Sequence, residues 1–156
     1  MKTNIIFTDI VGYSKLTGND QELALELLKE HDQIIEPIID RYDGTIVKRI
    51  GDAIVATFKD PGQILQAAIE IQQSLKNRNN RSIKSRHIIL RIGLHNGEVI
   101  FQNNELYGNG YELGMEIEPI CKYGGIAISE NLYKLTHQNN ELIVNGITNS
   151  FFVRPI

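Results

Sequence analysis

Apolar residues recur along this chain with two different periods, and each period predicts one kind of element. Uninterrupted apolar runs predict buried strands at Ile5–Thr8 and Ile126–Ser129. Apolar positions at helical spacing predict a long amphipathic helix from Asp20 to Tyr42 and a second helix that opens at Pro61. The other predicted elements are strands at Thr45–Lys48, Ala53–Phe58, Ile88–Leu94 and Glu98–Gln102, helices at Gly110–Ile120 and Glu130–Leu135, and a closing hairpin of Leu142–Val144 with Phe151–Val153.

The order of these elements predicts the fold class. It begins β-α-β-β-α-β and continues into a β-α-β-rich tail, which is the split, ferredoxin-like topology. We therefore expect one α+β domain over residues 1–156, with a central antiparallel sheet and helices mostly on one face. Asp20 and Ser129 are the expected N-caps of their helices.

The charge balance argues against several classes of function. The chain has 16 basic and 19 acidic residues and a net charge of −3, which disfavours broad binding to nucleic acid or to anionic membranes. Residues 76–86 are polar and basic, so we expect a mobile surface loop there, and they contain no aromatic residue for stacking on bases. No apolar run approaches the ~20 residues that span a bilayer, and no signal-peptide pattern is present, so the expected location is the cytoplasm.

Histidine and cysteine do not suggest a metal site. Cys121 is the only cysteine, which excludes an intramolecular disulfide and a cysteine-based zinc site, and we expect it to be a small core residue. The four histidines are scattered without zinc-ligand spacing. His95 is expected to be a packed turn residue, and Arg91 a structural residue of its strand.

Two aspartates stand where an apolar run meets a glycine. Asp9 follows the run at Ile5–Thr8, and Asp52 follows Gly51 between two predicted strands. One interpretation is that Asp9 caps a helix and Asp52 closes a hairpin, because Gly-Asp is a common turn pair. Taken together, two carboxylates at strand ends favour a shared site for hard divalent cations, which prefer oxygen ligands. Such sites recur in displacements at phosphorus.

Longer motifs around these aspartates resemble a known family. The segments Phe7–Ser14, Lys48–Ala53 and Leu90–Val99, followed by Tyr107-Gly108 and Gly124–Ser129, are similar to the successive signatures of class III nucleotidyl cyclases. The similarity runs in order over nearly the whole chain.

This resemblance implies a reaction and a site. The family converts a nucleoside triphosphate to a 3′,5′-cyclic nucleotide and pyrophosphate with two divalent cations, Mg²⁺ or Mn²⁺. By resemblance Asp9, Asp52 and the carbonyl of Ile10 would be the metal ligands, and Gly12 and Tyr13 would lie in the substrate site. The family's two subunits pack head to tail and build each site across their interface.

Two further positions match the residues with which the family selects its base. Lys48, four residues before Asp52, stands at the position of a base-reading lysine, and Glu105 at that of its acidic partner. A lysine donor suits N1 of adenine and a carboxylate accepts from the exocyclic amine, so the pair favours adenine. Cytosine also offers an acceptor beside an amine, and an ordinary surface ion pair remains an alternative.

Three positions depart from the family. The family has an asparagine that orients the ribose, an arginine that stabilises charge at phosphorus, and a C-terminal lysine that meets the terminal phosphates. This chain has Glu112, Glu116 and Asn145 there. The two glutamates are spaced i, i+4, which predicts that both carboxylates lie on one helical face, aimed at the triphosphate.

These departures leave three interpretations open. The chain is a cyclase whose nucleotide sits differently, the cyclases of phage defence that use UTP or CTP being one variant. Alternatively, it pairs with another cyclase chain and supplies only Asp9 and Asp52. Finally, it is a degenerate cyclase fold that binds nucleotide or a partner without turnover.

Overall fold

The computed structural model describes residues 1–136 and 151–154, the last four by their backbone alone. The sheet strands are β1 (Lys2–Ile10), β2 (Thr45–Ile50), β3 (Ala53–Phe58), β4 (Leu90–Glu98), β7 (Ile126–Ser129) and β8 (Phe151–Arg154). A separate hairpin consists of β5 (Ile100–Gln102) and β6 (Glu105–Tyr107). The helices are α1 (Tyr13–Asn19), α2 (Gln21–Arg41), α3 (Pro61–Asn80), α4 (Asn109–Met115) and α5 (Glu130–Thr136), with short 3₁₀ turns η1 (Lys84–Arg86) and η2 (Glu118–Ile120).

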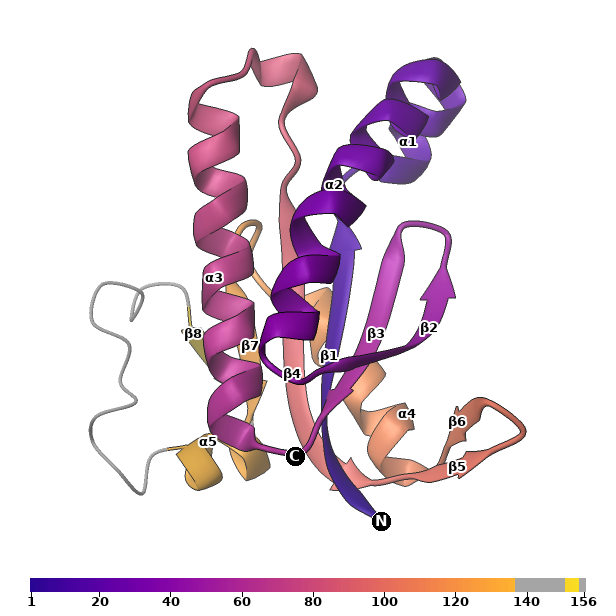
Figure 1. Cartoon of the computed structure of the whole chain (residues 1–156), viewed down its shortest axis with the longest axis vertical. Coiled ribbons are helices and arrows are strands. Elements are labelled where there is room, and N and C mark those ends of the chain that lie inside the picture. The colour runs from indigo at the N-terminus through magenta and orange to yellow at the C-terminus, as the bar shows by residue number, and fades with distance from the viewer. Residues whose placement is uncertain (137–150, 155–156) are drawn as a thin grey trace.

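The main sheet has the strand order β2-β3-β1-β4-β7-β8 (Figure 1). β1 is antiparallel to both β3 and β4, as the ferredoxin-like order predicts. One side of the sheet differs from the expected antiparallel arrangement, because β7 pairs parallel with β4 and the edge strand β8 pairs parallel with β7. The predicted α+β class is confirmed, and the parallel edge is a detail that element order alone does not fix.

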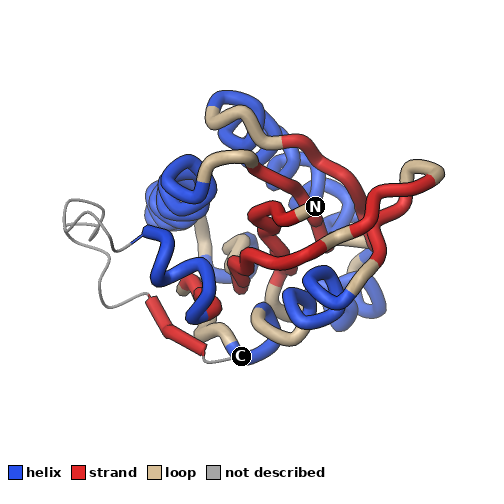
Figure 2. Tube along the Cα trace, turned by 90° about the horizontal axis from the view of Figure 1, so that it is seen from below, coloured by secondary structure: helices blue, strands red, loops and turns tan. Residues whose placement is uncertain are grey.

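Helices cover both faces of the sheet, as the view along the strands shows (Figure 2). α2, α3 and α5 pack on one face over the larger core, which contains Ile6, Ile10 and Leu94. α4 lies on the other face, where Tyr111 packs with Ile5 and Phe7. Because side chains alternate along a strand, the odd-numbered positions of β1, Asp9 among them, belong to the α4 face.

Several predicted boundaries are confirmed by capping contacts. Asp20 accepts a hydrogen bond from the backbone nitrogen of Leu23 (3.0 Å) and opens α2, and the Ser129 hydroxyl accepts one from the nitrogen of Leu132 (3.4 Å) in α5. α1 was not predicted. Its seven residues, which include Gly18, contain no apolar periodicity long enough to reveal a helix.

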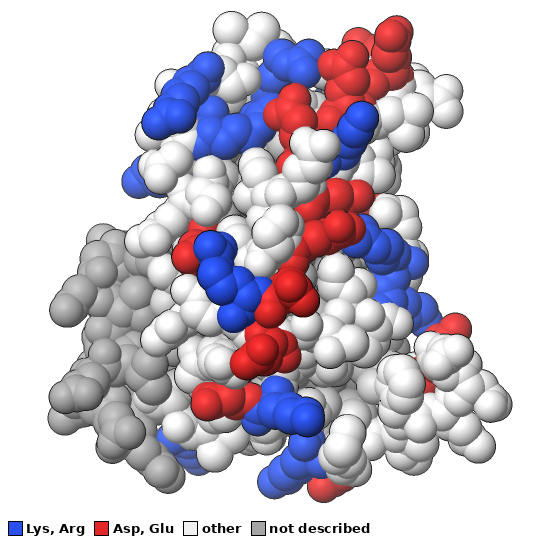
Figure 3. Space-filling view, in the orientation of Figure 1, with Lys and Arg blue, Asp and Glu red and all other residues white. Residues whose placement is uncertain are grey.

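The segment expected to be a mobile loop is instead built into the fold. α3 continues to Asn80 and is followed by η1. Arg78 donates to Glu30 of α2 (2.9 Å), and the Asn79 side chain bonds both the nitrogen and the oxygen of Ile88. On the face shown in Figure 3, acidic side chains form a row along α2 with basic side chains beside it. Two of the five basic residues of this segment, Arg78 and Arg86, thus pair with glutamates of α2.

The predicted helix from Gly110 to Ile120 is shorter than expected. α4 ends at Met115, and the chain then forms η2. Pro119 lies at the start of η2 and disfavours helical geometry in the residue before it. Of the predicted final hairpin, only residues 151–154 are described, and they form the parallel strand β8; residues 142–144 lie outside the described residues.

Candidate active site

Asp9 and Asp52 meet at one end of the sheet. Asp9 is the next-to-last residue of β1, and Asp52 lies in the turn between β2 and β3, where Gly51 has a φ of 59°. The backbone nitrogen of Ile10 donates a hydrogen bond to Oδ2 of Asp52 (2.7 Å). The β1–β3 pairing therefore joins the two carboxylates that the sequence separates by more than 40 residues.

The environment of Asp52 disfavours its negative charge. Burial raises the pKa of the Asp52 carboxyl, and the nearby charge of Asp9 raises it further, against the hydrogen bond from Ile10. A carboxylate whose negative charge is not balanced by a nearby positive group is a suitable ligand for a cation. Burial, rather than repulsion by Asp9, is therefore the main cause of the raised pKa of Asp52.

A third carboxylate, Glu118, lies against this pair and was missed by the sequence analysis. It is on η2, is 8% exposed, and burial together with the charge of Asp9 raises its pKa to about 7. Gly93 of β4 allows this approach, because a Cβ there would lie 2.6 Å from the backbone nitrogen of Glu118. The only feature of the sequence that could have pointed to Glu118 is its charge in the otherwise uncharged run of residues 117–120.

Arg91 neutralises part of this acidic cluster. It is directly opposite Asp9 in the β1–β4 register. Its Nη2 lies 3.3 Å from Oδ2 of Asp9, and its Nε lies 3.3 Å from Oε1 of Glu118. The structural role predicted for Arg91 is thus a specific one: it bridges an aspartate of the site to a buried glutamate.

Lys48 and Glu105 also come together. Lys48 Nζ on β2 lies 3.1 Å from Oε2 of Glu105 on β6, and 5.8 Å from the centroid of the Tyr111 ring. The hydrogen bond to Glu105 is the main cause that raises the pKa of Lys48. Both side chains are partly exposed, so they remain accessible to a ligand or a partner.

The divergent glutamates are at the surface of the chain. Glu112 lies on α4 and Glu116 caps its C-terminus, and both are exposed, while Gly110, Tyr111 and Gly114 face the sheet. Their orientation toward a dimer cleft stays a prediction. Asn145 lies outside the described residues.

Gly12 and Tyr13 stand between the metal-site strand and α2. Gly12 has a φ of 75° and begins α1. The Tyr13 hydroxyl donates to the carbonyl of Ala24 in α2 (3.1 Å). The hydroxyl of Tyr13 therefore has a structural partner in α2, and a role of Gly12 and Tyr13 in binding substrate stays a prediction.

The donor set fits hard divalent cations in part. Asp9, Asp52 and the Ile10 carbonyl offer only oxygen, as Mg²⁺ and Mn²⁺ prefer. Within residues 1–136 and 151–154, no three histidine, cysteine or acidic side chains are placed to hold a metal unaided. A site of this kind needs further ligands from substrate phosphates, which is the usual arrangement for magnesium.

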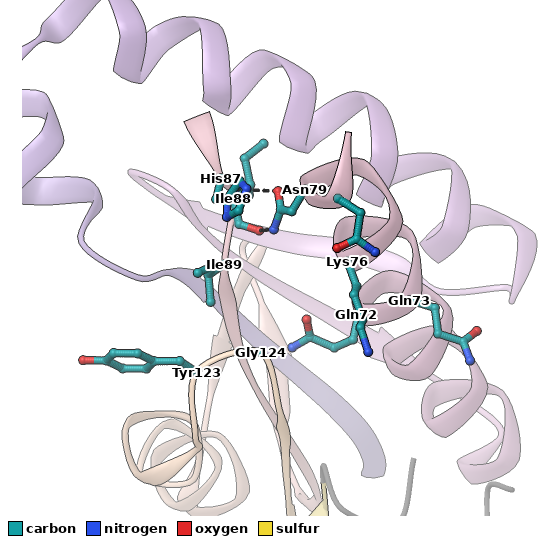
Figure 4. Close-up of a pocket in the computed structure, with 10 residues that line it drawn as sticks. Gln72, Gln73, Lys76, Asn79, His87, Ile88, Ile89, Tyr123 and Gly124 are labelled. Carbon is teal, nitrogen blue, oxygen red and sulfur yellow. Dashed lines mark hydrogen bonds between the residues drawn. The ribbon is translucent and has the colours of Figure 1, made fainter. Parts of the chain in front are cut away.

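One small hollow lies beside Asp9, and a larger cavity lies away from both aspartates. A hollow of about 160 Å³ is lined by Asp9, Tyr111, Met115 and Glu118 among others. A larger cavity of about 440 Å³ lies between α3 and the start of β4 (Figure 4). Two of the amide side chains that line it are bonded to the backbone, since Gln72 donates to the carbonyls of Leu90 and Gly125 and Asn79 bonds Ile88.

Two other predictions can be placed. His95 is buried and its Nδ1 lies 2.8 Å from the Ser129 hydroxyl, so it is packed as expected. The expected turn is wrong, because β4 continues through His95 to Glu98 and pairs with β1 along that length. Cys121 is buried beside Ile117 and Ala127, which confirms it as a small core residue.

Comparison with known proteins decides the family. The profile described as the adenylate and guanylate cyclase catalytic domain matches residues 2–150. This chain belongs to that family. The cyclase domain is 29% identical to an adenylate cyclase of Anabaena cylindrica over 152 residues, covering 85% of this chain and 30% of that protein. It is also 29% identical to guanylate cyclase 32E of Drosophila melanogaster, covering 84% of this chain and 13% of that protein.

Solved structures agree with the cyclase fold. The adenylate/guanylate cyclase/hydrolase of Silicibacter pomeroyi matches with a TM-score of 0.82 and 27% identity, over 88% of this chain and 81% of that one. The adenylyl cyclase CyaB of P. aeruginosa matches with a TM-score of 0.75 and 21% identity, over 88% and 81%. The chain thus spans less than a third of the two named sequence relatives but most of these crystallised domains. None of the helices that the structure describes is long and apolar enough to cross a membrane.

Proposed function

We propose that this cyclase domain converts a nucleoside triphosphate, with ATP favoured, into a 3′,5′-cyclic nucleotide and pyrophosphate. The observation that carries the proposal is the meeting of Asp9 and Asp52 at one end of the sheet, joined through the Ile10 backbone at 2.7 Å. Family membership alone does not require this geometry, since a degenerate member could lose either carboxylate.

Asp9, Asp52 and the carbonyl of Ile10 are the residues that would hold two divalent cations, Mg²⁺ or Mn²⁺. When bound, such cations lower the pKa of the ribose 3′-hydroxyl and offset charge on the triphosphate. The protein's own part is to hold the carboxylates in place. The Ile10 amide fixes one oxygen of Asp52, so that carboxylate cannot rotate freely.

Lys48 and Glu105 are the proposed base-reading pair. An ammonium donor and a carboxylate acceptor held 3.1 Å apart match the acceptor and the amine on adjacent atoms of adenine. Guanine presents the reverse pattern on that edge and would leave both groups unsatisfied, which costs free energy. ATP is therefore the favoured substrate.

The proposed active form is a head-to-tail dimer. Three apolar side chains of the β5–β6 hairpin, Ile100, Phe101 and Tyr107, are more than half exposed in the single chain. Such a patch beside Glu105 suits burial against a second subunit. Lys48 and Glu105 would then face the partner's metal aspartates.

Glu112 and Glu116 make a second candidate necessary. Both are exposed on or at the end of α4, where the family places residues that act on the substrate. Losing one oriented donor costs roughly 10²–10³ in rate. A homodimer would therefore be slow, and a heterodimer in which another cyclase chain supplies the asparagine and arginine is the alternative that this observation favours.

The test is direct. The purified protein is incubated with Mn²⁺ and each of the four ribonucleoside triphosphates, and cyclic products are quantified by mass spectrometry. Slow formation of cyclic AMP that is abolished by Asp52→Asn is the expected result. Asp40→Asn, which changes an exposed aspartate of α2, is the matched control. Cyclic UMP or CMP as the main product would overturn the preference for ATP, and no product from any triphosphate would favour the heterodimer or the degenerate fold.

A further inference from the structure

Glu118 is a buried acidic residue to which the proposed reaction assigns no role. Only 8% of its surface is exposed, although an ionised carboxylate is costly to bury without strong compensation. Its position requires a glycine on the neighbouring strand, because a side chain at position 93 of β4 would collide with the backbone of η2. A buried charge placed in this way beside Asp9 calls for an explanation.

Glu118 shares one guanidinium with Asp9. Arg91 approaches Oδ2 of Asp9 with Nη2 and Oε1 of Glu118 with Nε, each at 3.3 Å. Its third nitrogen, Nη1, donates to the Pro119 carbonyl (3.4 Å), and its Cζ lies 6.0 Å from the centroid of the Tyr123 ring. The guanidinium is thus held from several sides and gives only one of its nitrogens to Asp9.

We propose that Glu118 is a positioning residue for Asp9, which keeps Arg91 divided between two carboxylates so that Asp9 retains one oxygen for a divalent cation. This inference rests on the proposed function. A guanidinium with a single carboxylate partner prefers a bidentate pair that uses both oxygens. Without the charge of Glu118, Arg91 would close on Asp9 in that way and compete with the cation. The site would also lose one negative charge.

The test is Glu118→Gln, which keeps the shape and removes the charge. Mn²⁺ binding is measured by electron paramagnetic resonance, first on the nucleotide-free protein and then with 3′-deoxy-ATP. The phosphates of this analogue supply the further ligands, and it has no 3′-hydroxyl to react, so no turnover is required. At pH 8, where a carboxyl with a pKa of about 7 is mostly ionised, we expect affinity to fall by about fivefold or more, because a negative charge close to the cation is lost. The melting temperature without metal should stay the same or rise, since a buried carboxylate is replaced by a neutral amide. A merely structural role would lower it.

Two further variants make the result specific. Glu70→Gln removes a glutamate that pairs with Arg41 far from the site and should leave Mn²⁺ affinity unchanged. Adding Arg91→Gln to Glu118→Gln removes the competing guanidinium, so Mn²⁺ affinity should recover at least in part. A further loss in the double variant would show that Glu118 does not act through Arg91 and would overturn the inference.

The outcomes separate this inference from the proposed function. If Mn²⁺ binds the wild-type protein and Asp52→Asn abolishes binding, the metal site stands. Unchanged affinity in Glu118→Gln would then overturn the role of Glu118 alone. If the wild-type protein shows no Asp52-dependent Mn²⁺ binding even when 3′-deoxy-ATP supplies the phosphate ligands, both proposals fail together.

Discussion

At the scale of single residues, the candidate site is a balance between crowded carboxylates and one arginine. Asp9, Asp52 and Glu118 bring negative charge to one strand end, and Arg91 supplies the positive charge that the described residues place against Asp9 and Glu118. On the far side of Tyr111, Lys48 and Glu105 form a second, neutral pair. The first group suits a cation and the second suits a base, so the two halves of a nucleotide site differ in charge.

Lys48→Gln tests the proposed base contact. The glutamine loses the ammonium charge, and a hydrogen bond to a charged group is worth roughly 1.5–3 kcal/mol, so kcat/KM for ATP should fall by about tenfold or more. Activity with GTP should change much less, because guanine has a hydrogen on N1, where adenine offers the acceptor that Lys48 is proposed to bind. Steady-state kinetics with both nucleotides measure this, with the exposed Lys59→Gln as control. Equal losses for ATP and GTP would contradict base reading.

His95 predicts a pH dependence of stability. Burial lowers the pKa of this imidazole below 6.5, so the unfolded chain binds a proton that the folded chain resists. Its contribution is therefore complete above pH 6.5 and is lost as pH falls below it, with a slope of up to ~1.4 kcal/mol per pH unit. Urea unfolding from pH 7.5 to 5.5 should show a shallower decline for His95→Gln than for wild type. Parallel curves would contradict this, since other titrating groups are common to both proteins.

At the scale of elements, glycines decide how closely the layers approach. Gly93 admits η2 to the sheet, and Gly110 lets α4 lie on β4, where a Cβ would be 2.4 Å from the carbonyl oxygen of Glu98. In both cases an added Cβ would collide with backbone atoms of the neighbouring element, so a change of side-chain rotamer could not relieve the collision. The position of Glu118 on η2 thus requires that residue 93 of β4 has no side chain.

Gly93→Ala is expected to disturb the site through η2. The added methyl group would lie 2.6 Å from the Glu118 nitrogen, and overpacking of this kind costs typically ~1–3 kcal/mol. Denaturant unfolding should show that loss, and Mn²⁺ affinity should fall with it as Glu118 moves from Arg91. Gly18→Ala, in open space on α1, is the control and should not destabilise the protein. A destabilised protein with unchanged Mn²⁺ affinity would separate η2 from the site.

The elements also show what the sequence could predict. The strands and the two long helices follow from apolar periodicity, and the aspartates follow because each interrupts such a run at a glycine. Glu118 could not be assigned to the site from the sequence, because its place depends on η2 lying over Gly93. Likewise the parallel pairing of β7 depends on tertiary contacts, and the order of Arg78 and Asn79 depends on partners in α2 and β4 that a local pattern does not contain.

At the scale of the whole molecule, one chain presents two incomplete halves of a site. The proposed metal ligands Asp9 and Asp52 lie at the ends of β1 and β2, while the proposed base-reading pair lies between β2 and β6 beside an exposed apolar hairpin. A head-to-tail pair would bring each half against the complementary half of the partner. In that arrangement the two glutamates of α4 belong to the half that receives phosphate, and their charge opposes the reaction.

Mixing two variants tests this arrangement and the role of the glutamates together. One chain is wild type, with intact aspartates. The other carries Glu112→Asn, Glu116→Arg and Asn145→Lys to restore the family's residues, together with Asp52→Asn to disable its own metal site. Each chain alone should be slow or inactive, since one lacks the donors and the other lacks a metal ligand.

After co-refolding, half of the dimers should be mixed and each should contain one complete site. Cyclase activity with Mn²⁺ should then exceed that of the wild type by at least about tenfold, which corresponds to ~1.4 kcal/mol of recovered transition-state stabilisation. Preorganised donors give this gain without further reorganisation. The chain with the three restoring substitutions alone should show a rise about four times larger, because all of its sites are complete instead of a quarter of them. If wild type is a fast cyclase and these substitutions slow it, the glutamates serve a different working site. If the restored homodimer is active and the mixture is not, the subunits do not share their sites head to tail.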